Sequence, residues 1–230
     1  GAFITFVFLA TGLVLSYTRA AWIGVAAALL CSFIFILRIH TSLVWAAIVV
    51  FVIFLAFNIS SIILNLETTK EASSDDLASH LQSITNIKTD ASNTERINRW
   101  SSAIRMFKQK PLTGYGPGTY QFVYGPFQLN RELTYISTSQ GNRGNAHSEY
   151  LGPLAEQGLP GSLLFIAIGV ATLITASDFI INCRSHQLRA IAIGLILGMI
   201  TYWVHGFLNN FLHTEKASIP YWGFIGAIAA

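Results

Sequence analysis

The chain has 230 residues, of which 53% are hydrophobic and only 11% are charged, and its mean hydropathy is +0.53. Soluble domains carry about 25% charged residues, so this composition excludes an ordinary soluble domain and indicates that much of the chain lies in lipid. The net charge of +3 is too small to indicate a partner by itself, and its distribution along the chain is more informative.

Long apolar runs occur at 1–17, 20–37, 42–64, 158–182 and 188–212, and a shorter one at 220–230. All but the first and the last are comfortably long enough to cross about 30 Å of hydrocarbon as a helix. Because the chain begins at Gly1 inside an apolar run, we expect a piece of a longer membrane protein, without a signal peptide.

These runs predict an all-α fold: a polytopic transmembrane helical bundle with a long outward-facing, periplasmic loop that contains amphipathic helices. The expected organisation is three transmembrane helices in 1–66, the loop region in 67–157, and two transmembrane helices plus a truncated third in 158–230.

Arginines in short turns predict which side faces the cytoplasm. The two turns at 38–41 and 183–189 carry Arg38, Arg184 and Arg189. The order of the spans places both turns on one side, which we assign as cytoplasmic. The segment 67–157 then faces the periplasm, together with the turns at 16–20 and 213–220. A cytoplasmic domain at 67–157 stays open as the alternative.

The outer segment changes charge part-way along its length. From Glu67 to Glu95 six acids stand against two lysines, whereas from Arg96 to Ala146 seven bases stand against one acid. The acidic part is rich in Ser, Thr and Asn, and we interpret it as a solvated loop.

The basic part opens with a predicted amphipathic helix over 93–109. Ser92 and Glu95 have the spacing of a capping box, and Pro111 stops the helix. Its apolar residues recur at helical intervals, at Ile97, Trp100, Ile104 and Phe107. One interpretation is a surface helix in the membrane interface, anchored by Trp100.

A Gly-x-Gly-x-Gly sequence follows at 114–118. It is not a P-loop, because no Lys-Ser/Thr follows it and no strand is expected before it. The spaced glycines indicate a tight turn that approaches another group closely. Aromatic residues suited to an interface or to stacking on sugar rings come next, at Tyr120, Phe122, Tyr124 and Phe127.

Several motifs in a fixed order resemble the O-antigen ligase and O-antigen polymerase-like membrane protein family. They are SYTRAAW with Arg19, an R-x-x-x-W pair at Arg96 and Trp100, PLTGYGPG, AHSEYL and EQGLPG. The resemblance covers nearly the whole chain and would make it the C-terminal half of such a protein. Ser148 is a departure, because the family usually has Asn after the motif histidine.

The resemblance implies a multi-pass enzyme of the bacterial inner membrane with its active face in the periplasm. Such an enzyme transfers a glycan from an undecaprenyl-diphosphate donor to an acceptor hydroxyl, with no metal or other cofactor. The acceptor is the lipid A-core in ligases, another glycan in polymerases and a protein in related oligosaccharyltransferases. The shared motifs leave these three open. The lipid bilayer is a further expected partner, and nucleic acid is not.

The expected chemistry needs cations and a base. Arginine holds the oxygens of a departing diphosphate in bidentate geometry, and histidine is the side chain best suited to accept a hydroxyl proton near neutral pH. We therefore predict His147 as the catalytic base and Arg19, Arg96, Arg99 and Arg143 as diphosphate-binding residues. Four further residues are expected to support these side chains from behind or to line the cavity: Glu149, Tyr150, His205 and Asn209, the last two on one face of a helix.

Two other functions are weighed against the transferase. A small-anion transporter should carry ionisable residues near mid-membrane, but the runs 20–37, 42–64 and 158–177 carry no charge. A purely structural membrane protein leaves the arginines and His147 unexplained. The sequence favours a reaction at one membrane face.

Overall fold

The computed structural model describes residues 1–15, 18–37, 91–135, 137 and 144–230, without the side chains of Ala2, Arg19 and residues 91–93. Over these residues the fold is all-helical, as expected, with no strand. The elements are α1 (Ala2–Leu15), α2 (Arg19–Ile36), α5 (Ala91–Gln109), α6 (Tyr120–Val123), η2 (Gly125–Phe127), η3 (Asn130–Glu132), α7 (Leu151–Asn182), α8 (His186–His205) and α9 (Glu215–Ala229). The expected span at 42–64 and the acidic loop up to Asp90 lie outside the described residues.

Two of the described helices, α7 and α8, are long and apolar enough to cross a membrane, and shorter apolar helices occupy Phe3–Leu15 and Ala20–Ile36. The apolar run at 188–212 is not one helix, because α8 ends at His205 with Gly206 as its C-cap. The expected turn at 213–220 is also wrong in part, since α9 already begins at Glu215. Apolar composition alone does not mark where a helix ends.

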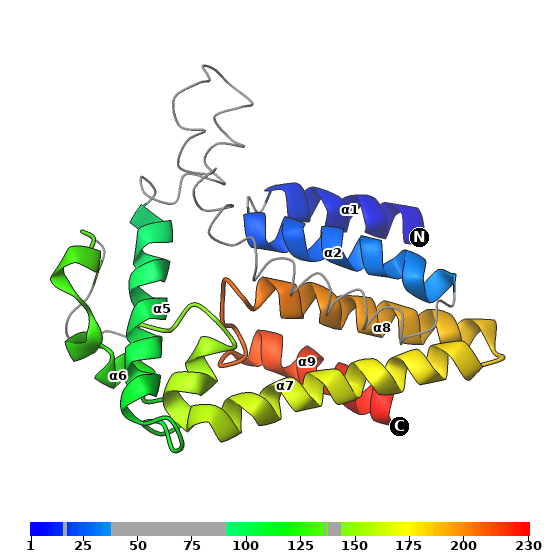
Figure 1. The fold of residues 1–230 in the computed structure, drawn as a ribbon. Coiled ribbons are helices and arrows are strands. Elements are labelled where there is room, and N and C mark those ends of the chain that lie inside the picture. The colour runs from blue at the N-terminus through cyan, green and yellow to red at the C-terminus, as the bar shows by residue number, and fades with distance from the viewer. Residues whose placement is uncertain (16–17, 38–90, 136, 138–143) are drawn as a thin grey trace, which may run out of the picture.

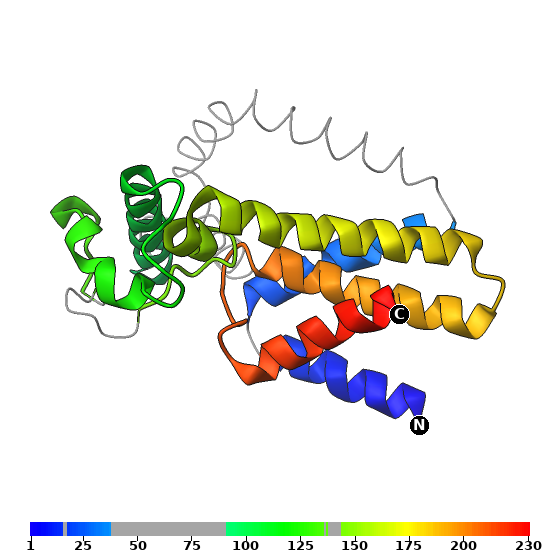
Figure 2. The same ribbon diagram turned by 90° about the horizontal axis from the view of Figure 1, so that it is seen from below.

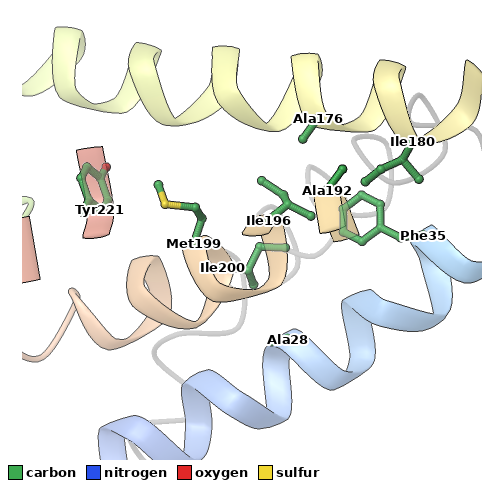
Figure 3. Packing of buried hydrophobic residues seen from close by; sticks show 9 residues of the cluster. All are labelled: Ala28, Phe35, Ala176, Ile180, Ala192, Ile196, Met199, Ile200 and Tyr221. Carbon is green, nitrogen blue, oxygen red and sulfur yellow. The ribbon is translucent and has the colours of Figure 1, made fainter. Parts of the chain in front are cut away.

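The apolar helices α1, α2, α7, α8 and α9 run side by side (Figures 1 and 2). Their core is formed mainly by α7 and α8, with Ile180, Ile196 and Met199 fully or almost fully buried (Figure 3). Gly24 of α2 lies against the Thr201 carbonyl of α8, where a Cβ would stand only 2.7 Å from that oxygen. The beginning of α2 therefore lies beside the end of α8.

Large apolar side chains cover the outside of this bundle. Phe3 and Phe8 of α1 are 77% and 76% exposed, Leu30 of α2 is 70% exposed and Leu164 of α7 is 65% exposed. Soluble monomers rarely expose contiguous apolar patches of this kind, whereas lipid chains cover them without loss. The surface fits a membrane protein, as α7 and α8 do.

Helix α5 lies crosswise to α7 and α8, at the end of the bundle where α7 begins and α8 ends (Figures 1 and 2). It occupies Ala91–Gln109 and confirms the helix predicted over 93–109. The capping box is wrong, because the helix begins one residue before Ser92 and the Glu95 carboxylate binds Arg99 instead.

The face of α5 that packs inward is more polar than its apolar stripe predicts. Fully buried residues on it are Asn98, Ser102, Ala103 and Met106, whereas Ile97 and Ile104 of the stripe are each 40% exposed. Trp100 turns inward, and its indole N–H donates to the His147 carbonyl at 3.2 Å. The helix therefore uses Trp100 to hold another chain segment.

The Gly-rich turn docks on the first turns of α7. The backbone N–H of Gly116 donates to the Glu156 carbonyl at 2.7 Å, and the N–H groups of Gly118 and Tyr120 each donate to the Glu156 carboxylate at 2.9 Å. Just beyond, α7 bends at Gly158, where the backbone is not helical. The turn and the bend fix α5 relative to α7.

Substitutions of Gly114 and Gly118 by alanine should separate packing from backbone strain. Both glycines have positive φ, +61° and +73°, but a Cβ at Gly114 would stand 2.3 Å from the Glu156 carbonyl whereas a Cβ at Gly118 meets nothing within 4 Å. We expect Gly114→Ala to lower the free energy of unfolding by at least about 2 kcal/mol more than Gly118→Ala, because only the former forces the turn off α7. Thermal unfolding in one detergent measures the difference, and equal losses would contradict the docking described above.

Candidate functional site

The candidate site is organised around His147, whose backbone has a φ of +48°. Left-handed backbone is uncommon for residues other than glycine and is found when surrounding contacts enforce it. Here the backbone N–H of His147 donates to the Asn145 side-chain oxygen at 3.0 Å, and its carbonyl accepts the Trp100 indole N–H. His147 is therefore held from both sides in a conformation that it would not adopt alone.

Arg99 fixes the chain just before His147. Its Nε forms a buried ion pair with Glu95 Oε1 at 2.7 Å, and its Nη1 donates to the Asn145 carbonyl at 3.3 Å. The guanidinium lies over the Tyr124 ring, 5.1 Å from the centroid. Gly144 passes so close to it that a Cβ there would stand 2.1 Å from Nη1. These contacts give Arg99 a positioning role beside the site.

The surroundings of His147 keep its imidazole neutral. Burial, followed by the positive charges of Arg99 and Arg96, lowers its pKa from 6.5 to about 4, against a smaller opposing effect from Glu95. Glu95 is itself buried, which raises the pKa of its carboxyl, but hydrogen bonds from Ser137 and Arg99 and the Arg99 charge outweigh that effect and lower the pKa overall. A neutral histidine thus lies in the field of two arginines.

The positive charge of Arg96 acts on two histidines that are 58 positions apart in sequence, His147 and His205. His205 is the last residue of α8, and its ring stacks on Phe211 at 5.5 Å between centroids. The Asn209 amide lies 3.3 Å from His205 Nε2. That contact comes from the turn after α8, so the expectation of one shared helix face is wrong.

Glu149 connects the His147 segment to the turn between α8 and α9 through hydrogen bonds. Its Oε1 accepts hydrogen bonds from the Tyr202 hydroxyl at 2.5 Å and from the backbone N–H groups of Phe211 and Leu212 at 2.5 and 2.9 Å. Its own N–H donates to the Gly206 carbonyl at 2.8 Å. The carboxylate thus sets the position of the turn that carries Asn209.

The next residues start α7. The Ser148 hydroxyl accepts hydrogen bonds from the N–H groups of Tyr150 and Leu151 at 3.3 and 3.4 Å, in the turn just before α7, whose N-cap is Tyr150. Asn side chains accept such bonds in turns as Ser side chains do, so the departure from the family motif is compatible with this turn. The Tyr150 hydroxyl donates to the Trp203 carbonyl at 3.0 Å and its ring stacks on Phe207, so Tyr150 joins α7 to the end of α8.

Two of the predicted arginines are described less fully. Arg19 is the first residue of α2, and because α2 begins beside the end of α8, it starts its helix at the same end of the bundle as His205. Its side chain and the whole of Arg143 lie outside the described part of the chain.

A half-open cavity of about 590 Å³ lies against the His147 segment. Its described walls come from the Gly-rich turn, the segment 144–149, the first turns of α7 and the turn after α8. Of the predicted residues, Glu149 lines it, whereas the lining residues next to His147 are Ala146 and Ser148. The cavity therefore borders the chain segment that carries His147.

Two residues that shape the site are absent from the sequence-based predictions: Asn145 supports the left-handed backbone of His147, and Glu95 pairs with Arg99. Asn210, next to the predicted Asn209, contributes a buried side-chain oxygen that accepts no hydrogen bond from a described residue. A signal existed for Asn145, since asparagine two residues before another residue commonly accepts its N–H in a turn. Adjacent asparagines in an apolar run, at 209 and 210, were a signal for the end of α8.

A comparison with family models decides what kind of protein this is. The model described as O-Antigen ligase matches residues 4–166. The chain belongs to the O-antigen ligase family. No curated protein and no solved structure matches it. The family resemblance drawn from the motifs is confirmed, and the family implies glycosyltransferase activity of the ligase or polymerase type.

The matched part of this O-antigen ligase family chain runs from α1 into α7. It includes Arg96, His147 and Glu149, and it ends before His205 and Asn209. The turn after α8 is thus part of the site by contact, through Glu149, and lies beyond the matched region.

Acid should destabilise this ligase-family chain through His147. In the unfolded chain the histidine binds a proton near pH 6.5, whereas in the folded chain its pKa is about 4. The unfolded state therefore binds more protons between these values, and the free energy of unfolding should fall by up to about 3 kcal/mol as the pH drops from 6.5 to 4. His147→Asn should remove that part of the dependence, because asparagine tolerates left-handed backbone and does not titrate.

Unfolding at pH 7 and pH 4.5 measures this effect, with His186→Asn, at the opposite end of α8, as the matched control. If His147→Asn and His186→Asn retain the same acid sensitivity as the unmodified chain, His147 is not held neutral.

Proposed function

We propose that the chain carries the active centre of a membrane glycosyltransferase of the O-antigen ligase type. It transfers a glycan from an undecaprenyl-diphosphate donor to an acceptor hydroxyl on the periplasmic face of the bacterial inner membrane. The lipid A-core is the proposed acceptor, and a polysaccharide polymerase or a protein oligosaccharyltransferase is the alternative within the same chemistry. The observation that carries the proposal is the left-handed, neutral His147 beside Arg96.

The reaction needs a base that is unprotonated at neutral pH. His147 meets this need, because burial and two guanidinium charges keep its pKa low. It accepts the proton of the acceptor hydroxyl while that oxygen attacks the anomeric carbon of the donor sugar. The bond from this carbon to the diphosphate oxygen breaks, and its electron pair leaves with undecaprenyl diphosphate. The imidazolium then releases its proton to water.

The leaving diphosphate gains negative charge as the bond breaks. Arg96 is the described arginine best suited to stabilise it, because its charge reaches both His147 and His205. Arg99 is engaged by Glu95 and Asn145, so we assign it to holding the loop and to the local positive field. Arg19 and Arg143 complete the proposed diphosphate-binding set by their motif positions.

Donor binding should also raise the pKa of His147. The same arginine charges that lower the pKa of His147 are neutralised when a diphosphate binds beside them. Its pKa then rises towards neutral pH, which strengthens the base in the complex that reacts.

The architecture supports a reaction at the membrane surface. Helix α5 lies crosswise to α7 and α8 (Figure 1), so it lies along the bilayer plane if those two helices cross the membrane. Its exposed Ile97 and Ile104 then face lipid headgroups and acyl chains, as in interfacial helices. A polyprenyl donor could present its diphosphate there without leaving the bilayer.

Glycan transfer by the full-length parent protein in proteoliposomes tests the proposal. With an undecaprenyl-diphosphate-linked glycan and lipid A-core acceptor, we expect His147→Asn to lower kcat by about 10²–10⁴-fold, since the base is lost, and Arg96→Ala by about 10²-fold or more. The matched control is Arg131→Ala, which removes an exposed arginine of η3 and should leave kcat unchanged. Equal rates for His147→Asn and the unmodified protein would refute the assignment of the base.

Trp100→Phe should slow the reaction without a large loss of stability. The variant keeps an aromatic ring but loses the hydrogen bond to the His147 carbonyl, so we expect kcat to fall about 10-fold with little change in the KM of either substrate. Trp203→Phe is the control, because it removes an indole bond to Tyr221 inside the bundle. If both variants lose activity in proportion to their lower Tm, Trp100 has a purely structural role.

A further inference from the structure

We propose that Glu156 is a positioning residue for the transfer reaction, and that it acts on Arg99 through the rings of Tyr120 and Tyr124. This inference rests on the proposed function, because it concerns how a cation beside the proposed base is held. It is drawn from a series of contacts that leads from α7 through α6 to α5.

The Glu156 carboxylate fixes the place where α6 begins. Its Oε2 accepts the Gly118 N–H and its Oε1 accepts the Tyr120 N–H, each at 2.9 Å. Backbone N–H groups that converge at a turn form a concavity that binds an anion, and here a side chain of the same protein fills it. The carboxylate therefore holds the first residue of α6 in a set position relative to α7.

Tyr120 connects α6 to α5. Its side chain is almost fully buried, and its hydroxyl donates to the Arg99 carbonyl at 2.8 Å. Its ring stacks on that of Tyr124, with 5.1 Å between the centroids and 5° between the planes. Tyr124 is fully buried as well. Because both rings are packed inside the protein, they support α5 and are not exposed for stacking on a sugar.

Tyr124 brings the ring pair against Arg99 and the chain before His147. The Arg99 guanidinium lies over the Tyr124 ring, 5.1 Å from its centroid. A Cβ on Gly144 would stand 2.8 Å from the Tyr124 hydroxyl oxygen and 2.1 Å from Arg99 Nη1. Packing as close as this leaves no room for one group to move alone. A displaced ring pair therefore displaces Arg99 relative to His147.

A displaced Arg99 has a measurable effect on His147. Among the charges that act on this imidazole, that of Arg99 lowers its pKa most, ahead of Arg96, and Glu95 opposes both. The effect of a charge weakens with distance, so movement of Arg99 away from the imidazole raises the pKa. Loss of the negative charge of Glu156 would by itself lower the pKa of His147. A rise in a Glu156 variant thus reports a displaced Arg99 and not the missing charge.

Glu156→Gln and Tyr120→Phe, made in the full-length parent protein, test the inference. Glutamine has one acceptor oxygen in place of two, so one of the backbone N–H groups loses its partner. Phenylalanine keeps the ring and loses the bond to the Arg99 carbonyl. In an NMR titration of the histidine rings, either change should raise the pKa of His147 by at least about 0.5.

Glycan transfer by the same variants gives the second measurement. Either change should lower kcat about 10-fold and leave the KM of both substrates nearly unchanged, because the base is misplaced while the donor and acceptor contacts remain. The double variant should lose no more than the weaker single variant, since both changes break one series of contacts. Glu132→Gln is the matched control. It removes a carboxylate that pairs with Arg105 of α5 and should change neither kcat nor the pKa of His147.

A lower Tm with unchanged kcat and unchanged His147 pKa overturns the proposal, because Glu156 is then purely structural. So does a double variant in which the two losses of kcat multiply, or a Glu132→Gln variant that shows the same rise in pKa. If Glu156→Gln does not fold, an unchanged pKa and kcat in Tyr120→Phe overturn the proposal.

The two proposals fail in different ways. If the unmodified protein transfers glycan and Glu156→Gln lowers kcat without raising the pKa of His147, the link to Arg99 is wrong and the proposed function stands. If no acceptor is glycosylated but both variants raise the pKa of His147, the proposed function fails and the link from Glu156 to Arg99 stands.

Discussion

The structure depends on how the segment 144–149 is held between the crosswise helix and the bundle. Arg99 and Trp100 of α5 bind its backbone carbonyls from one side, and Glu149 binds the turn after α8 on the other. Asn145 closes the constraint from within by accepting the His147 N–H. Without these contacts His147 would relax out of left-handed backbone, and its imidazole would leave the field of the arginines.

This constraint explains why polar residues occupy the inner face of α5. A helix that only covered a bundle would bury its apolar stripe, but α5 buries Glu95, Asn98, Arg99 and Ser102. The buried ion pair between Glu95 and Arg99 is a costly way to stabilise a protein, because both charges lose water. It makes sense where a fixed positive charge and a fixed loop are needed, and both lie beside His147. Positioning and electrostatics are thus supplied by the same side chains.

The parts of this arrangement that repeat locally could be predicted from sequence, and those that join distant segments could not. The period of Ile97, Trp100 and Ile104 predicts a helix, but not that Trp100 bonds a carbonyl 47 positions away. Hydropathy predicts an apolar run to 212, yet α8 ends at His205 with Gly206 as its C-cap. In the turn beyond it, the Phe211 N–H donates to the Glu149 carboxylate. Motif order indicated the family, and the match over 4–166 confirmed it. The Asn210 oxygen has no sequence signature, since an unpaired buried acceptor is defined by what surrounds it.

The central claim is that His147 is a neutral base under the control of a neighbouring diphosphate site. Its most direct test is an NMR titration of the histidine rings in the full-length protein. The His147 signal is identified by its absence from the spectrum of the His147→Asn variant. The account predicts a pKa near 4 without donor and a clear rise towards neutral pH when undecaprenyl diphosphate is added. A His147 that titrates near 6.5 and does not respond to the diphosphate would contradict it.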